Sequence, residues 1–111
     1  WAALERDGSE LADRALRAMV AASPTGLKLT LRLLRLGRSS RTLEECLVRE
    51  YRAACRALRG HDFYEGIRAA VIDKDKRPRW SPARLEDVSD ALIGEHLAPV
   101  ADETTIFPKE V

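Results

Sequence analysis

Apolar residues recur along most of this chain at the three- and four-residue spacing of an α-helix. Over residues 9–22 they return on one side, and Ser9 stands at the position of a helix cap. We therefore predict an all-α fold, a small bundle of about four to five helices over residues 1–98, followed by a C-terminal tail over 99–111. The helices are predicted at about 9–22, 24–36, 43–58, 63–72 and 89–97.

Several of the predicted helix boundaries carry residues that favour a start or a stop. Ser23, Thr42 and Asp62 each precede a predicted helix, where a side-chain oxygen can accept a hydrogen bond from a free backbone N–H group. Glu65 follows Asp62 at the spacing of a capping box. We expect helix-capping roles for these four residues and expect Gly37 to end the second helix.

The segment 27–36 alternates leucine with polar residues, which is the pattern of a strand. Its Ser-Pro start, its length and its strong helix formers favour a helix instead. In a helix the leucines fall on two opposite sides, Leu27, Leu31 and Leu34 on one and Leu29, Leu33 and Leu36 on the other. Both sides need a cover, so these six residues are candidates for packing against another domain or a second subunit. In an isolated monomer this helix should expose apolar surface.

Composition narrows the range of partners. Hydrophobic residues make up 45% of the chain but aromatic residues only 5%, so leucine and alanine must form most of the core. The 19 basic and 18 acidic residues leave a net charge of +1, which gives no reason to expect nucleic-acid or membrane binding. Apolar runs fall short of the roughly 20 residues that a membrane span requires. Residues 1–22 carry acids where a secretory signal needs an apolar stretch.

Cys46 and Cys55 lie on one predicted helix, on opposite sides and roughly 13 Å apart. They cannot form a disulfide with each other without unwinding that helix. Two reduced thiols indicate a reducing compartment: the cytoplasm, or the mitochondrial matrix if the protein is eukaryotic. The chain begins at Trp1 without a methionine, so we expect it to be a piece of a longer protein.

Candidate chemistry gathers between residues 60 and 82, where His61, Asp62 and Glu65 lie close together. Sequence neighbours rarely point at each other and no nucleophile is near, so capping explains these residues better than catalysis. Gly66 leaves room for another backbone or a ligand, and Trp80 is expected to pin the following loop. Motifs for phosphate loops, metal sites or a nucleophile elbow are missing. We therefore predict no catalytic residue, metal or cofactor site in this chain.

Four blocks occur in a recognisable order: SPTGLKLT at 23–30, TLEECL at 42–47, EYR at 50–52 and the segment GHDFYEGIRA from residue 60. Together they resemble the C-terminal region of the 3-hydroxyisobutyryl-CoA hydrolase family, a branch of the enoyl-CoA hydratase/isomerase (crotonase) superfamily. The resemblance covers residues 23 to 88. It implies a larger N-terminal core, absent from this chain, that binds an acyl-CoA substrate and holds the oxyanion hole.

The resemblance also implies a role for these helices. In the superfamily they cover the acyl pocket and make subunit contacts, often within trimers, so a homo-oligomer is expected. The 111-residue chain alone is predicted to be inactive. Two alternatives stay open: the same region of an enoyl-CoA hydratase or isomerase, and a non-catalytic helical oligomerisation module.

One finer implication concerns CoA itself. In hydratase relatives an aromatic residue and a lysine shortly after the Glu-Gly turn can contact the CoA of a neighbouring subunit. Here Ala70 stands near the aromatic position, while Lys74 or Lys76 could supply a cation for a CoA phosphate. A solvated loop is the simpler interpretation, because Asp73 and Asp75 weaken the local positive charge.

Overall fold

The computed structural model describes residues 1–106, and of Thr105 only the backbone. Within this range it contains helices and no strand, which confirms the all-α class. The α-helices are α1 (Ala2–Asp7), α2 (Glu10–Ala21), α3 (Pro24–Ser39), α4 (Leu43–Ala57), α5 (Asp62–Ile67), α6 (Asp90–Glu95) and α7 (Glu103–Ile106). A π-helix, η1 (Arg68–Ile72), follows α5, and a 3₁₀-helix, η2 (Leu85–Asp87), precedes α6.

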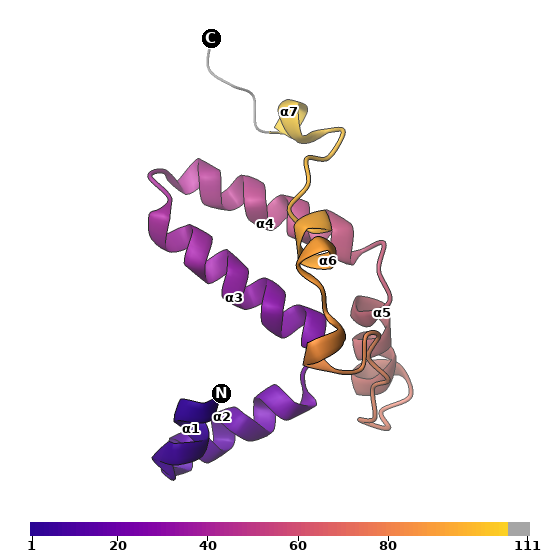
Figure 1. Ribbon diagram of the computed structural model, residues 1–111. Helices are drawn as coiled ribbons and strands as arrows, with labels where there is room; N and C mark the ends of the chain where they lie inside the picture. Colours follow the sequence, from indigo (N-terminus) through magenta and orange to yellow (C-terminus); the bar gives the residue numbers. More distant parts are fainter. Residues whose placement is uncertain (107–111) are drawn as a thin grey trace.

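The centre of the molecule is the antiparallel pair α3 and α4, with α6 and η2 lying against α3 (Figure 1). The α1–α2 hairpin extends away from the start of α3, and α5 with η1 follows the end of α4, at the same end of the antiparallel pair (Figure 1). At the far end, Tyr51 donates to Asp102 Oδ2 at 2.8 Å, and Arg52 forms an ion pair with Glu103. These two contacts tie α7 to α4.

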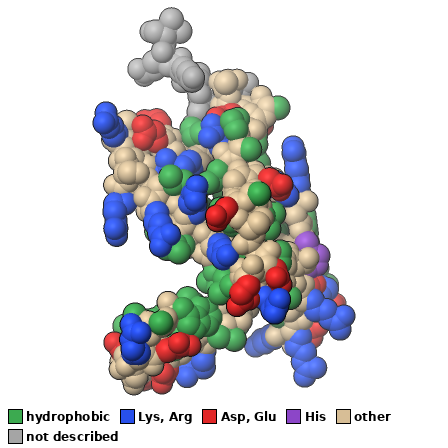
Figure 2. Space-filling view, viewed as in Figure 1, with side chains coloured by type: hydrophobic (Ala, Val, Ile, Leu, Met, Phe, Trp, Pro, Cys, Tyr) green, Lys and Arg blue, Asp and Glu red, His purple; other side chains and the backbone are tan. Residues whose placement is uncertain are grey.

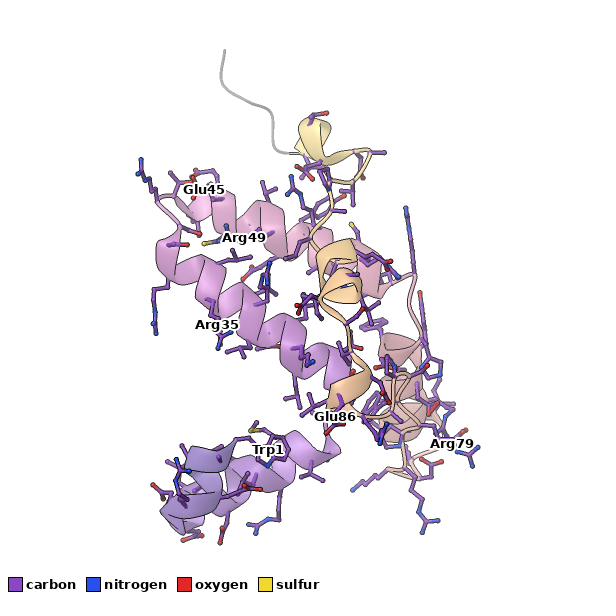
Figure 3. The ribbon with its side chains drawn as sticks, in the orientation of Figure 1. Trp1, Arg35, Glu45, Arg49, Arg79 and Glu86 are labelled. Carbon is purple, nitrogen blue, oxygen red and sulfur yellow. The ribbon has the colours of Figure 1, made fainter. Side chains whose placement is uncertain are left out.

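Side-chain caps start the longer helices. Ser23 Oγ accepts from Gly26 N–H at 3.1 Å, and Thr42 Oγ1 accepts from Glu45 N–H at 3.3 Å, which are the roles expected of them. Glu45, at the turn between α3 and α4 (Figure 3), returns a bond by accepting from Arg41 N–H at 3.0 Å. A capping box thus closes around Thr42, shifted by one residue at its outer end.

The structure corrects several predicted boundaries. α1 was not predicted; it is six residues long and ends at Gly8, which has a positive φ of 69°. α3 runs past Gly37 to Ser39, because the hydroxyls of Ser39 and Ser40 both donate to Leu36 O and end the helix there. The predicted 63–72 helix divides into α5 and η1.

The last two predicted segments also change. The predicted 89–97 helix shortens to α6, and a Ser89 side-chain bond to Leu92 N–H caps it. The predicted tail contains α7, while residues 107–111 lie outside the described residues.

The core of the described chain is thin. Its buried hydrophobic residues are small or medium in size: Ala12, Ala53, Ala69, Val88 and Ile93. The radius of gyration is 16.2 Å, whereas a compact domain of this length has about 13 Å. A chain that buries so little apolar surface gains little from the hydrophobic effect, so its packing is incomplete.

The leucines of α3 illustrate this incompleteness. Leu31 is 48% exposed and Leu34 is 68% exposed, while the other four are half-buried. The predicted exposure of apolar surface on this helix is therefore confirmed. Figure 2 shows hydrophobic side chains at the surface of the α1–α2 hairpin as well. Cys46 and Cys55 on α4 are free thiols.

Candidate functional site

The start of α3, the end of α4, α5, η1 and α6 line a partly open cavity of about 580 Å³. Its walls are mostly apolar, and Phe63 packs edge-on against Tyr64 with ring centroids 5.5 Å apart. Pockets of this size and character suit a small organic group with an apolar body. The larger apolar side chains in the wall are Leu29, Phe63, Ile67, Val71, Trp80 and Leu92.

Among the polar side chains that line these walls, two are notable for their burial, Thr25 and His96. Thr25 Oγ1 is buried and has no hydrogen-bond partner among the described residues. His96 is only 7% exposed, and its Nδ1 lies 2.9 Å from Leu92 O. Because a carbonyl oxygen only accepts, Nδ1 carries the proton and Nε2 is the ring nitrogen left for a ligand. The sequence pattern gave no signal for either residue, since both depend on distant parts of the chain.

Asp62 joins the two ends of the cavity wall. Its Oδ2 accepts from Ser23 Oγ at 2.5 Å, and its Oδ1 accepts from Ser81 N–H at 2.9 Å. Oδ1 also lies 2.8 Å from His61 Nδ1. The expectation that these two neighbours point apart is therefore wrong.

The capping role predicted for Asp62 is also wrong. α5 begins at Asp62 itself, with His61 at its N-cap position and no side-chain capping bond. The carboxylate is occupied by Ser23, which lies 39 positions earlier, and by Ser81, 19 positions later. These long-range partners replace the local N–H groups that a cap would bind.

Glu65 does not cap the helix either, because Arg68 occupies its carboxylate. Arg68 Nε and Nη2 donate to the two oxygens of Glu65 at 2.6 and 2.9 Å, while Nη1 donates to Asp73 and Asp75, both at 2.8 Å. Glu65 also accepts from Arg79 N–H at 2.8 Å. The bonds from Arg68, helped by the Arg79 N–H group, lower the pKa of Glu65 to about 2.

Lys74 and Lys76 lie on the loop that Arg68 organises. Both are exposed, and neither forms an ion pair within the described part of the chain. Their φ angles are 56° and 55°, a left-handed conformation that costs a residue other than glycine about 1–2 kcal/mol. Asp73 and Asp75, the acids expected to weaken the charge of these lysines, both form ion pairs with Arg68.

Trp80 closes the loop over Gly66. A β-carbon placed at Gly66 would lie 3.4 Å from the Trp80 ring, so the space left by this glycine is filled by the indole. Trp80 Nε1 donates to Ala21 O at 3.1 Å, which attaches the loop to the end of α2. The predicted pinning of the loop by Trp80 is confirmed, and the close approach at Gly66 comes from a side chain of the same chain.

The sequence model of the enoyl-CoA hydratase/isomerase family matches residues 1–97. The chain belongs to this family. Its helical architecture is therefore the helical part of a crotonase-type enzyme. Arg68 stands within the block that carries the resemblance, but its role as a hub could not be read from the order of residues.

Curated members of the family include close relatives of this chain. It is 51% identical to 3-hydroxyisobutyryl-CoA hydrolase, mitochondrial, of Mus musculus over 94% of its length, which is 27% of that protein. It is 48% identical to the Gallus gallus protein of the same name over 89% of its length and 26% of the relative. The 3-hydroxyisobutyryl-CoA hydrolase 1 of Arabidopsis thaliana is 42% identical over 91% of this chain and 28% of the relative.

Solved structures of the family share the fold. A carnitinyl-CoA dehydratase from Mycobacterium thermoresistibile superposes with a TM-score of 0.84 at 35% identity, covering 97% of this chain and 31% of that one. An enoyl-CoA hydratase from Rhodobacter sphaeroides gives 0.82 at 41% identity, covering 92% of this chain and 30% of that one. The chain spans about a quarter of the length of the curated relatives it matches.

Among the described residues, no helix is long and apolar enough to cross a bilayer. Nor do they bring three His, Cys, Asp or Glu side chains together in a way that could hold a metal ion.

Proposed function

We propose that this chain is the C-terminal helical part of an enzyme that hydrolyses the thioester of 3-hydroxyisobutyryl-CoA, a step of valine degradation. The observation that carries the proposal is the 48–51% identity to animal hydrolases of that name over most of this chain. The catalytic residues would lie in an N-terminal crotonase-like core. No catalytic residue is assigned to this chain, and no cofactor other than the CoA-bound substrate.

The role of these helices would be to cover the acyl-CoA site. The apolar cavity supports this role, since its walls suit the hydrocarbon part of a short acyl group. Thr25 and His96 provide polar atoms inside it that could meet a hydroxyl or carbonyl group.

Lys74 and Lys76 are proposed to contact a phosphate of CoA. The support is electrostatic: both lysines are exposed, and the neighbouring carboxylates are bound to Arg68. A cation without an internal partner is available to a phosphate oxygen, whereas a paired one must first break its bond.

The leucines of α3 are proposed to contact the missing core or a second copy of the protein, which would make it a homo-oligomer. The exposure of Leu31 and Leu34 supports this role, because apolar patches on a finished surface usually mark an interface. The names of the animal relatives support a mitochondrial location, with a bacterial cytoplasm as the alternative if the source is bacterial.

The test is a thiol-release assay with 3-hydroxyisobutyryl-CoA, run on the full-length protein and on the 111-residue chain. We expect turnover from the full-length protein only. An inert full-length protein would sink the hydrolase proposal, and turnover by the chain alone would place catalytic groups within it.

A second candidate is hydration of an enoyl-CoA, favoured by the 41% identity to the hydratase from Rhodobacter sphaeroides. Loss of the enoyl-thioester absorbance of crotonyl-CoA, without thiol release from the hydroxyacyl substrate, would favour it over hydrolysis.

A further inference from the structure

We propose that Arg68 is a positioning residue for phosphate binding. Its guanidinium holds the 73–79 loop in a conformation that leaves Lys74 and Lys76 exposed and without an ion pair to Asp73 or Asp75. This inference rests on the proposed contact between these lysines and a phosphate of CoA. It assigns a structural cause to that contact and makes the contact dependent on a residue that never touches the ligand.

Every N–H donor of the Arg68 guanidinium has an acceptor. Its five N–H donors meet five acceptor atoms: the two oxygens of Glu65, one oxygen each of Asp73 and Asp75, and Arg77 O at 3.3 Å. Bidentate and multiple bonds of this kind fix geometry as well as supply energy. Arg68 therefore acts as a rigid junction between α5 and the loop.

Residues that bind the Arg68–Glu65 pair alternate along the loop with residues that do not. Residues 73, 75, 77 and 79 all bind the Arg68–Glu65 pair, through side chains at the first two and backbone groups at the last two. Between them, Lys74 and Lys76 make no side-chain bond within the described residues, and Lys76 N–H donates to Ala69 O at 3.0 Å. The odd-numbered residues are thus bound, and the lysines are presented to solvent.

The backbone is strained at both lysines, which have positive φ angles. A left-handed conformation at residues other than glycine persists only where the surrounding bonds determine it, and such strain concentrates at binding sites. Here the residues that flank the lysines are bound to Arg68 or Glu65, and Lys76 N–H is bound to Ala69 O. A loop that served only as a connection could relax by turning either lysine to a negative φ.

Arg68 also pairs with the two carboxylates nearest the lysines. Without Arg68, the carboxylates of Asp73 and Asp75 would lose their partner and could pair with the adjacent lysines or repel an anion. Arg77 and Arg79 are also exposed and without an ion pair within the described residues, and Arg79 lies at the outer edge of the molecule (Figure 3). Figure 2 shows basic side chains gathered at this end. A phosphate group is the anion that such a surface fits, from either the 3′-phosphate or the diphosphate of CoA.

The test measures the dissociation constants of CoA and of 3′-dephospho-CoA by calorimetry, with the full-length protein. Arg68→Gln should weaken CoA binding about tenfold, comparable to the loss of one charge-assisted bond. An unchanged affinity for 3′-dephospho-CoA assigns the 3′-phosphate, and an equal loss for both ligands assigns the diphosphate. Arg84→Gln is the matched control, because it removes the same charge from an exposed pair with Asp87 and should leave both constants unchanged.

A substrate that lacks both the 3′-phosphate and the diphosphate of CoA distinguishes the positioning role of Arg68 from a purely structural one. Turnover of the pantetheine thioester of 3-hydroxyisobutyrate should keep its kcat/KM in Arg68→Gln, and an equal loss on this substrate and on the CoA thioester would overturn the inference. Arg68→Lys keeps the charge but not the five donors, so it should bind CoA with intermediate affinity. This variant preserves the test if Arg68→Gln fails to fold.

Variants of the two lysines test the proposed phosphate contact independently of the positioning role of Arg68. If the double variant Lys74→Ala and Lys76→Ala binds CoA as tightly as the unaltered protein, the proposed phosphate contact is wrong. If that variant weakens binding but Arg68→Gln does not, the contact stands and the positioning role falls. If the unaltered protein hydrolyses neither thioester, the hydrolase proposal fails while the CoA constants still test Arg68.

Discussion

Helix α3 and the segment from His61 to Ser81 meet at the same cavity, but different forces hold them. The six leucines of α3 are half-buried or exposed. Among the described residues, a hydrogen bond from Lys28 Nζ to Val88 O at 2.9 Å joins this helix to a distant part of the chain. The 61–81 segment is tied together by two carboxylates and one guanidinium, each of which takes three or more bonds.

The two regions differ in whether the chain itself supplies the partners of their side chains. The polar groups around Asp62 and Arg68 find their partners inside the chain, so the chain itself specifies their geometry. The leucine faces of α3 find only partial cover within the described residues. Their burial depends on a surface contributed from elsewhere. Substitutions in the two regions should therefore differ in size and in context.

The largest effect is expected at Trp80. Trp80→Ala removes the ring that fills the space over Gly66 and the bond to Ala21 O, and should lower the free energy of unfolding of the 111-residue chain by about 3 kcal/mol. Urea unfolding followed by circular dichroism at the helical band would measure it. Trp1→Ala is the control: Trp1 is 45% exposed, so we expect a change within about 0.5 kcal/mol. Equal losses at both positions would contradict the assignment of Trp80 as the pin.

Asp62→Ala should have the next largest effect, about 2 kcal/mol, because it removes the acceptor for Ser23 Oγ and Ser81 N–H together. Asp62→Asn keeps one acceptor oxygen and should lose less. The same urea experiment measures both, with the exposed Asp87→Ala as the control. A loss at Asp62 no larger than at Asp87 would show that the segment is not held by this carboxylate.

Acid should release the loop at a pH set by Glu65. Its pKa in the folded chain is about 2, below the ordinary value of 4.5, so its stabilising contribution is present above about pH 4.5. That contribution is lost as the pH falls from 4.5 towards 2. Nuclear magnetic resonance of the Arg79 amide should therefore show a midpoint near pH 2. In Arg68→Gln the midpoint should rise; an unshifted midpoint would mean that Arg68 is not the cause.

The smallest effect in the isolated chain is expected at the exposed leucine face. Leu34→Glu should change the free energy of unfolding by less than about 0.5 kcal/mol, since Leu34 is 68% exposed. Leu29→Glu places a charge in the cavity wall and should cost more. If this face makes the proposed contacts in the full-length protein, Leu34→Glu should lower the thermal midpoint or dissociate a homo-oligomer, as read by scanning calorimetry and gel filtration. If Leu34→Glu changes neither the stability of the isolated chain nor the thermal midpoint and oligomeric state of the full-length protein, this leucine face is not an interface.

The comparison also marks the limit of what the sequence predicts. The helices, the capping bonds of Ser23 and Thr42 and the two-sided leucine pattern follow from spacings of three or four residues, which fix neighbours on a helix. Asp62 and Glu65 have the same local spacing as a capping box, but their strongest partners lie up to 39 residues away. A local pattern cannot reveal such competition.

The cavity residues were missed for the same reason. Thr25 and His96 line the same cavity only when α3 and α6 pack against each other, and neither carries a local pattern that marks a binding site. The ion pairs of Asp73 and Asp75 with Arg68 could not be predicted either, because sequence distance does not tell which cation those acids bind.

The bond between Trp80 and Ala21 spans 59 positions, and that distance has a cost in time. A ribosome adds about 5–20 residues per second, so the end of α2 waits roughly 3–12 s for the indole that closes it. During that interval α3 is already synthesised and its leucines face water without their neighbours. Leu29, which lines the same cavity as Trp80, therefore lacks this neighbour until the loop has been synthesised.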